Sequence, residues 1–362
     1  MKALILTSHT GHGHVSLAQA LSDRLTPDYT VDIVDPQSDL ICSHYRLVSR
    51  HAQWLWGAEF RLIDTPRRSA FAHKVFTRLF AGSIRETLER SRPDVVITTH
   101  PLLTVAVMDA MNERGLRCPL ILMFADPGRL HHSWLTERRA AVTFAPTADT
   151  YRQALDAGFH ADRLHLTGWP VRRQFHEVDH RNRPSTLVRL GLDPDRFTVL
   201  LQGGGEGAAK FARIARRLLA VPALQVLVAA GTNQSLPHGL GGLDRVRVVP
   251  FTNEFAKIMN AADVVMGKAG PNTLFEAATL AKPFIATSYI PGQEQPNLRF
   301  IDRNGLGWIA LQAREQLAIL SRLASDADAR RAATEAAGMF SARNEVAARN
   351  LRYFIDSALS HA

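Results

Sequence analysis

Cysteine and long apolar runs are scarce in this sequence. Of its 362 residues only two are cysteines, Cys42 and Cys118, which cannot form a framework of disulfides and fit a reducing compartment. No segment approaches the roughly 20 consecutive apolar residues that a membrane-spanning helix requires. The apolar run at residues 4–6 turns polar at Thr7, which indicates a first strand rather than a secretory signal. These absences predict a cytoplasmic protein whose contact with membranes, where it has one, is peripheral.

The composition is that of a folded protein with more than one core. Hydrophobic residues make up 46% of the chain and charged residues 21%, which is typical of a globular rather than a disordered protein. A chain of 362 residues is too long for one typical core, so we expect two domains.

Positive charge is concentrated in one window. The net charge is +9, and residues 42–92 hold ten Lys or Arg against four Asp or Glu, an excess of six. Aromatic residues interleave with these cations, as at Trp54, Trp56 and Arg61, followed by Arg67 and Arg68. Such a surface suits the headgroup region of a bilayer that contains anionic lipids. The alternative is an ordinary core with a solvated basic face. No nucleic-acid recognition motif accompanies the charge, so we expect no nucleic-acid partner.

A strand, a glycine turn and a helix start follow one another late in the chain. The apolar residues 264–266 predict a buried strand, residues 267–270 form the turn, and Pro271 suits the first turn of a helix. The free N–H groups and dipole of a helix start attract phosphates. Glu276 on that helix offers a carboxylate that can accept both hydroxyls of a ribose. This pattern favours a nucleotide diphosphate site over a plain surface helix with a solvated Glu276.

These motifs carry a resemblance to a known family. The stretch Lys268-Ala269-Gly270-Pro271, together with Glu276 and the later Pro291-Gly292-Gln293-Glu294, resembles the donor site of glycosyltransferase family 28. It is most similar to the branch that glycosylates diacylglycerol. The resemblance implies that Glu276 binds the ribose of UDP and that Gln293 and Glu294 face the sugar. The nucleotide-sugar residues that it implies are Gly203, Gly204, Gly205, Glu206, Phe251, Lys268, Ala269, Gly270, Pro271, Thr273, Glu276, Gln293 and Glu294.

A second glycine loop lies near the N-terminus. Residues 3–7 predict a strand and residues 15–25 a helix, and between them stands Ser-His-Thr-Gly-His-Gly-His, which ends at His14. The loop resembles one that lipid glycosyltransferases place at the cleft, and His14 matches the family's functional histidine. Read without the resemblance, His14 is a helix-capping residue. The histidines lack the spacing of a helical pair and a nearby Cys or carboxylate, so we predict no metal site.

Asp126 is the second candidate for catalysis. It follows the apolar residues 119–124 and so lies at the carboxyl end of a predicted strand, where open α/β sheets bind ligands. The next residues resemble the relatives' Asp followed by His and Trp, and the spacing leaves open whether His131 or His132 corresponds. The residues predicted for acceptor and membrane contact are Gly11, Gly13, Trp54, Trp56, Arg61, Arg67, Arg68, His132 and Trp134.

The order of elements predicts an α/β fold. Alternating strands and helices in two halves, then a helical tail, match the glycosyltransferase B architecture. In it, two Rossmann-like domains face a central cleft and a C-terminal helix crosses back to the first domain. We predict an acceptor and membrane domain at 1–175, a linker at 176–184, a UDP-sugar domain at 185–340 and the returning helix at 341–362.

The resemblance implies a metal-independent, inverting transfer of glucose or galactose from a UDP-hexose to 1,2-diacylglycerol. His14 is then the first candidate for the base, and Asp126 either the second or the group that orients His14. No cofactor is expected, since the UDP-sugar is the donor substrate. The partners are the UDP-hexose, diacylglycerol and anionic lipids at the inner face of a membrane. Alternatives are a peptidoglycan lipid-intermediate N-acetylglucosaminyltransferase, a UDP-sugar 2-epimerase and a non-catalytic nucleotide-sugar-binding protein.

Overall fold

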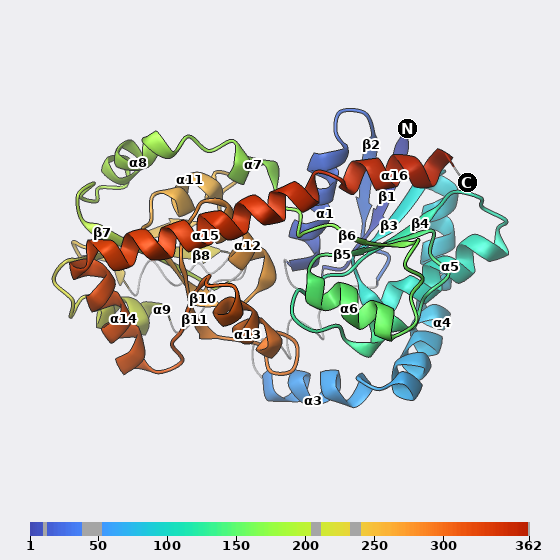
Figure 1. The fold of residues 1–362 in the computed structure, drawn as a ribbon, viewed down its shortest axis with the longest axis horizontal. Coiled ribbons are helices and arrows are strands. Elements are labelled where there is room, and N and C mark those ends of the chain that lie inside the picture. Colours follow the sequence, from blue (N-terminus) through green and yellow to red (C-terminus); the bar gives the residue numbers. More distant parts are fainter. Residues whose placement is uncertain (10–12, 38–52, 204–210, 232–239, 361–362) are drawn as a thin grey trace. The chain divides into compact units, whose positions relative to one another are not determined.

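The computed structural model describes residues 1–9, 13–37, 53–203, 211–231 and 240–360 (Figure 1). They divide into two compact units, and each unit contains one six-stranded sheet. The first unit comprises Met1–Arg172, Ile290–Pro296 and Arg343–Ala362, and the second comprises Arg173–Tyr289 and Asn297–Ala342. The segment with Gln293 and Glu294 thus belongs to the first unit, although its neighbours along the chain belong to the second.

The sheet of the first unit is parallel throughout, in the order β2-β1-β3-β4-β5-β6. Its middle strands are apolar and fully buried, as expected of parallel strands covered on both faces. The strands are β1 (Lys2–Leu6), β2 (Thr30–Val34), β3 (Val95–Thr98), β4 (Leu120–Met123), β5 (Val142–Ala145) and β6 (Leu164–Leu166).

Helices connect these strands. The longest of the first unit, α4, begins after Thr65 with Pro66 in its first turn, where the missing N–H of proline costs no helical hydrogen bond. It ends at Ser91 because Arg92 adopts the left-handed conformation, with φ 46°. The helical segments are α1 (Gly13–Leu25), α3 (Gln53–Ile63), α4 (Pro66–Ser91), η1 (Pro101–Leu103), α5 (Thr104–Glu113), η2 (His132–Leu135), α6 (Ala148–Asp156) and α16 (Leu351–Ser360).

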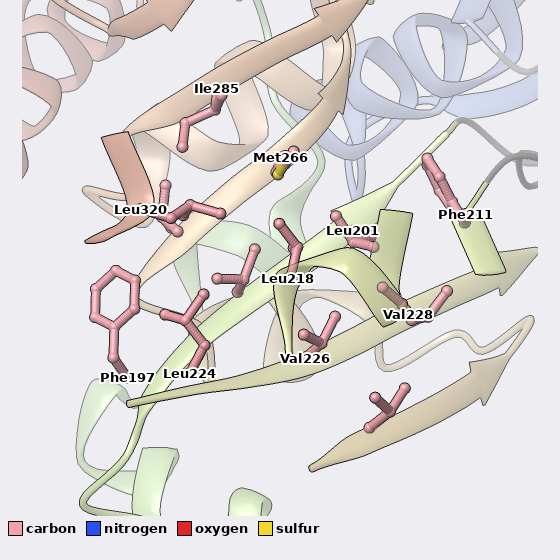
Figure 2. Close-up of a cluster of buried hydrophobic side chains, with 14 of the residues drawn as sticks. Phe197, Leu201, Phe211, Leu218, Leu224, Val226, Val228, Met266, Ile285 and Leu320 are labelled. Atoms are coloured by element: carbon pink, nitrogen blue, oxygen red, sulfur yellow. The ribbon is translucent and has the colours of Figure 1, made fainter. Parts of the chain in front are cut away.

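The sheet of the second unit is also parallel, in the order β12-β11-β10-β7-β8-β9. Figure 2 shows its core, in which Leu201, Val226, Met266 and Ile285 from four strands meet Leu320 and further helical side chains. The strands are β7 (Phe197–Gln202), β8 (Leu224–Gly231), β9 (Val246–Pro250), β10 (Val264–Lys268), β11 (Phe284–Ser288) and β12 (Gly307–Ile309).

The helical segments that accompany this sheet are α7 (Arg173–His176), η3 (His180–Asn182), α8 (Arg183–Arg189), α9 (Phe211–Leu218), α11 (Phe255–Asn260), α12 (Pro271–Thr279), α13 (Gln295–Arg303), α14 (Ala313–Ser325) and α15 (Ala327–Ala348). The domain boundaries at 1–175, 176–184, 185–340 and 341–362 stay a prediction.

The C-terminal part of the chain returns to the first unit, as predicted. Residues Arg343–Ala362, which include the end of α15 and α16, cluster with that unit. Ion pairs hold them there: Arg24 contacts Glu345 at 2.6 Å, and Arg352 contacts Asp28. No helix within the described ranges is long and apolar enough to cross a membrane.

Candidate functional site

Each sheet has one point at which successive strands change direction along the sheet. In the first unit it lies between β1 and β3, and in the second between β7 and β10. Ligands of open parallel sheets bind outside the carboxyl ends of the strands at such switch points. The two stretches that the sequence singles out follow β1 and β10. The fold therefore provides one candidate ligand site in each unit.

His14, which follows β1, contacts the residue that follows β3, on the other side of the switch point. It lies at the start of α1, after β1, and its Nδ1 is 2.7 Å from the carbonyl oxygen of Thr99, just beyond β3. A carbonyl only accepts, so Nδ1 carries a proton and, in the neutral ring, Nε2 bears the lone pair. The His100 ring packs edge-on against His14 at a centroid distance of 4.9 Å.

This surrounding keeps the His14 imidazole neutral. Burial lowers the pKa of His14 below its ordinary value of 6.5, and the Thr99 carbonyl and the charge of Asp35 oppose that shift. At neutral pH the ring is therefore uncharged and able to accept a proton. The sequence predicted His14, whereas Thr99 and His100 were missed, because they follow β3 without any motif of their own.

Asp126 lies beyond the end of β4, where its carboxylate accepts a hydrogen bond from Trp134. The distance from Trp134 Nε1 to Asp126 Oδ2 is 2.9 Å, and the Trp134 side chain is fully buried against Phe124. Burial raises the pKa of Asp126 to about 7; the Trp134 bond opposes the rise, and the negative charges of Asp64 and Glu294 add to it. Asp126 is thus a carboxyl that changes protonation near neutrality.

The two histidines after Asp126 have different environments. His131 is buried and uses both ring nitrogens, with Nδ1 2.7 Å from Ser133 Oγ and Nε2 3.0 Å from the Phe60 carbonyl. His132 is partly exposed, and its Nδ1 lies 2.8 Å from Asp64 Oδ1. The contacts of His131 are those of a structural residue, and the place of His132 on the acceptor side stays a prediction.

Asp64 joins the turn between α3 and α4 to the loop after β4. Its side chain also accepts from the His132 backbone N–H at 3.0 Å and from Arg129 at 2.6 Å. Burial acts to raise the pKa of Asp64, but the hydrogen bonds from His132, the charge of His131 and the hydrogen bond from Arg129 together hold the pKa below its ordinary value. Sequence reasoning missed Asp64, because its partners lie far away along the chain.

In the second unit, the ends of β7 and β10 approach each other closely. A Cβ added to Gly267 would lie 1.8 Å from the Gln202 carbonyl oxygen, so only glycine fits there. The Gln202 side chain accepts a hydrogen bond from Thr273 at 3.1 Å, which links the end of β7 to the first turn of α12. The helix start is thereby fixed against the switch point.

Helix α12 begins as phosphate-binding helices do. Gly270 is its N-cap residue and provides no side-chain acceptor, and Pro271 occupies the first turn. An uncapped start of this kind leaves its dipole to an anion. Glu276 lies farther along α12 with 5% of its surface exposed, and Lys268 ends β10.

Glu294 belongs to the first unit, where its buried carboxylate closes a turn. It accepts the Ile290 N–H at 2.8 Å, and its own N–H donates to the Ile290 carbonyl at 2.9 Å. The segment lies against α3, because a Cβ on Gly57 would be 2.8 Å from Pro291 Cβ. Glu294 is also one of the charges that raise the pKa of Asp126.

The structure thus groups the predicted residues into three sets. His14 contacts the Thr99 carbonyl. Asp126 accepts a hydrogen bond from Trp134, and the charge of Glu294 raises its pKa. The turn after β10 packs against Gln202, which accepts a hydrogen bond from Thr273. No hydrogen bond or ion pair joins His14 to Asp126 in the described part of the chain.

Phe251 is 61% exposed after β9. Gly11, Gly204, Gly205, Glu206 and the side chains of Trp54 and Trp56 lie outside what the structure describes.

Models of two protein families match this chain, one over most of the first unit and one over most of the second. The family model described as monogalactosyldiacylglycerol (MGDG) synthase matches residues 16–171, and that described as glycosyltransferase family 28 C-terminal domain matches residues 198–348. A probable chloroplastic monogalactosyldiacylglycerol synthase of Glycine max is 30% identical over 84% of this chain and 62% of its own length. Chloroplastic monogalactosyldiacylglycerol synthase 1 of Arabidopsis thaliana is 29% identical over 90% of this chain and 64% of its own length. The chain therefore spans less than two thirds of these relatives.

Solved structures share the fold at low identity. A UDP-GlcNAc 2-epimerase from Neisseria meningitidis bound to UDP-GlcNAc aligns over 100% of both chains with TM-score 0.62 and 12% identity. The calicheamicin glycosyltransferase CalG4 aligns over 99% of this chain and 98% of its own, with TM-score 0.64 and 15% identity. This likeness confirms the predicted glycosyltransferase B architecture. Because an epimerase and a glycosyltransferase share it, the fold does not choose between the two reactions.

Proposed function

Because the chain belongs to glycosyltransferase family 28, in the branch of the monogalactosyldiacylglycerol synthases, we propose that it transfers a hexose from a UDP-sugar to the free hydroxyl of 1,2-diacylglycerol. The observation that carries the proposal is the pair of family models, which together match both units. The names of the relatives favour galactose as the hexose.

The switch-point site of the second unit suits the donor. The start of α12 takes the diphosphate, with Lys268 and Gly203 at the ends of the two flanking strands. Glu276 accepts the ribose hydroxyls. As the bond between the sugar and UDP breaks, negative charge grows on the diphosphate, and the helix start stabilises it in place. Gln293 and Glu294 are proposed to contact the sugar.

The switch-point site of the first unit suits the acceptor. The neutral His14 ring takes the proton of the diacylglycerol hydroxyl at Nε2, and the hydroxyl oxygen attacks the anomeric carbon. UDP leaves from the opposite side, so the configuration inverts. Asp126 is the alternative base. A carboxyl with a pKa near neutrality is able to play that part, so the two candidates have to be separated by experiment.

A membrane surface is proposed along α3 and α4. Arg61, Arg67 and Arg68 are exposed, and Leu62 and Phe71 beside them are 57% and 69% exposed. Exposed apolar side chains with adjacent cations are typical of proteins that lie on anionic bilayers. Such a surface brings the enzyme to an acceptor that does not leave the membrane. Residence at the inner face is part of the proposal.

The function is tested by incubating the purified chain with diacylglycerol vesicles and radiolabelled UDP-galactose or UDP-glucose. We expect label in a new lipid that migrates with monogalactosyldiacylglycerol, and less or none from UDP-glucose. A boiled sample of the same protein provides the inactive control. Label that appears only as free sugar would contradict the proposal, and so would conversion of UDP-GlcNAc to its 2-epimer in a parallel sample that contains UDP-GlcNAc.

A further inference from the structure

A cavity lies in the second unit at the amino ends of its strands, whereas the proposed donor site lies at their carboxyl ends. Its volume is about 540 Å³, and its lining includes Phe197 and Val264 at the beginnings of β7 and β10. The donor site lies beyond the carboxyl ends of these strands. A cavity of this size is within the range of about 300–1,000 Å³ that small-molecule sites occupy.

The charged residues of the lining are mostly cations. Lys282, Arg330 and Arg331 face one carboxylate, that of Asp263. Asp263 already accepts hydrogen bonds from the Thr198 N–H at 2.7 Å and from Arg183 at 2.9 Å. Arg331 is paired with Asp328 at 2.7 Å. With Arg183 and Asp328 counted, four positive charges against two negative charges leave an excess of two at the cavity.

Backbone geometry places Lys282 in this lining. Helix α12 ends at Thr279, Ala281 just beyond it adopts the left-handed conformation at φ 54°, and the Lys282 N–H donates to the Ala277 carbonyl at 2.8 Å. This is the pattern of a Schellman cap, in which glycine normally occupies the left-handed position. The chain accepts some strain at Ala281, and Lys282 follows directly after it.

The Lys282 ammonium has no hydrogen bond or ion pair among the described residues. Burial lowers the pKa of Lys282 to about 8; the charge of Asp263 opposes this shift and that of Arg183 adds to it. At neutral pH the group still carries its proton, so three N–H donors remain to be satisfied. Lys282 is only partly exposed, so these donors are less well solvated than at the open surface and favour an acceptor that binds in the cavity.

Another part of the lining is apolar. The Phe197 ring is buried at one end of the core cluster (Figure 2), and the Arg330 guanidinium lies 5.7 Å from its centroid. Arg330 also donates to the Ala324 carbonyl at 3.0 Å, which holds its side chain over the ring. Leu323 and Leu280 complete an apolar surface next to the cations.

We propose that this cavity binds a phosphate monoester, with the phosphate at Lys282 and Arg331 and the organic part against Phe197 and Leu323. A phosphate monoester carries close to two negative charges at neutral pH and three acceptor oxygens, which match the excess charge and the donors of Lys282. A monocarboxylate would leave one positive charge uncompensated. Binding at this cavity does not depend on glycosyl transfer, because the cavity lies at the amino ends of the strands and the proposed donor site at their carboxyl ends.

Amine footprinting tests the site residue by residue. The chain is acetylated in the presence of saturating UDP, with phenyl phosphate, inorganic phosphate or benzoate added, and modification at each lysine is read by mass spectrometry. We expect phenyl phosphate to protect Lys282 at lower concentration than inorganic phosphate does. Lys257, which is exposed and paired with Glu254, should react equally in every sample. Absence of protection at Lys282, or equal protection by benzoate, overturns the proposal.

Two variants provide an independent readout. The Kd of phenyl phosphate, measured by calorimetry with UDP present, should rise about tenfold or more in Lys282→Met, because a charge-assisted hydrogen bond is lost. Lys257→Met is the matched control and should leave the Kd unchanged. Arg331→Met, at an exposed position, should also weaken binding and serves if Lys282→Met does not fold. An unchanged Kd in a folded Lys282→Met or Arg331→Met protein refutes the site.

Discussion

At the scale of single residues, His14 and Asp126 are two candidate bases with different pKa values. Burial depresses the pKa of His14 below 6.5 and raises that of Asp126 to about 7. A base works only when it is deprotonated, so the rate falls as the pH drops through its pKa. The pH dependence of the reaction therefore distinguishes the two residues.

We predict that kcat/KM for the lipid acceptor stays constant from pH 8 down to below 6.5 and falls only at lower pH. His14→Ala should lower turnover by about 10²–10⁴-fold, the usual contribution of a general base, with UDP affinity retained. The measurement is initial rate against pH between 5 and 9. An acid limb near pH 7 with only a few-fold loss in His14→Ala would instead assign the base to Asp126.

The raised pKa of Asp126 also predicts how the stability of the protein depends on pH. Its pKa in the folded protein, about 7, lies above the ordinary value of 3.8, so the folded state holds the proton more tightly than the unfolded chain. The free energy of unfolding must then fall as pH rises from about 4 to 7. Asparagine stays neutral and still accepts from Trp134.

We therefore expect Asp126→Asn to be more stable than the wild type at pH 8 by about 2–4 kcal/mol, given about 1.4 kcal/mol per pKa unit. At pH 4 the difference should nearly vanish. Urea unfolding at both pH values measures it, and Asp156→Asn on the exposed end of α6 is the control. Equal free energies of unfolding at pH 8 would mean that burial does not destabilise the ionised carboxylate of Asp126.

Glu276 is the residue on which the proposed donor site depends most. Glu276→Gln should weaken UDP binding by about 10-fold or more, because a neutral amide replaces hydrogen bonds to a carboxylate worth about 1.5–3 kcal/mol each. Calorimetry with UDP gives the result, and Glu335→Gln on the exposed side of α15 is the matched control. An unchanged affinity in the folded variant would remove Glu276 from the site.

At the scale of elements, the proposed donor site depends on how closely β10 lies beside β7. Gly267→Ala would place a methyl group within 1.8 Å of the Gln202 carbonyl, and backbone cannot move aside as a side chain does. We expect a loss of about 3 kcal/mol or more in the free energy of unfolding, the upper range for overpacking, together with weaker UDP binding.

The control for that change is Gly82→Ala in the middle of α4, where an added Cβ meets nothing within 4 Å. It should stabilise the protein by about 0.5–1 kcal/mol, because alanine favours a helix over glycine. Thermal unfolding of both variants decides the matter. Similar stabilities for Gly267→Ala and wild type would mean that the two strands can separate without loss.

At the scale of the whole molecule, the excess of positive charge is expected to act at a membrane. Neutralising Arg61, Arg67 and Arg68 together should weaken binding to anionic vesicles by about 1 kcal/mol per charge. Added salt should weaken wild-type binding for the same reason. Replacing Trp54 and Trp56 should weaken it without changing the salt dependence, since that contribution is apolar burial.

Vesicle co-sedimentation measures these effects, and neutralising the exposed Arg181, Arg322 and Arg349 provides a variant of equal net charge. That control should bind as the wild type does. Equal binding of the wild type to neutral and anionic vesicles, with no effect of the triple change, would show that this window is ordinary surface.

The sequence by itself determined the strands, the switch-point loops and the fold. Buried parallel strands are continuous apolar runs, as in β4 and β10, and a turn that brings two backbones together requires glycine, as at Gly267. These are local requirements, so they can be read without knowing what lies opposite. Proline at the starts of α4 and α12 marks helix beginnings for the same local reason.

Only the tertiary structure decided which polar groups face one another. The Asp64–His132 bond joins residues 68 positions apart, and the Thr273–Gln202 bond joins residues 71 apart. The separate environments of His131 and His132, the pKa of Asp126 and the cavity at Lys282 likewise depend on which elements fold against them. Hydrogen bonds and burial act through space over a few ångströms, and the chain positions that meet at that distance are fixed by packing, not by neighbouring residues.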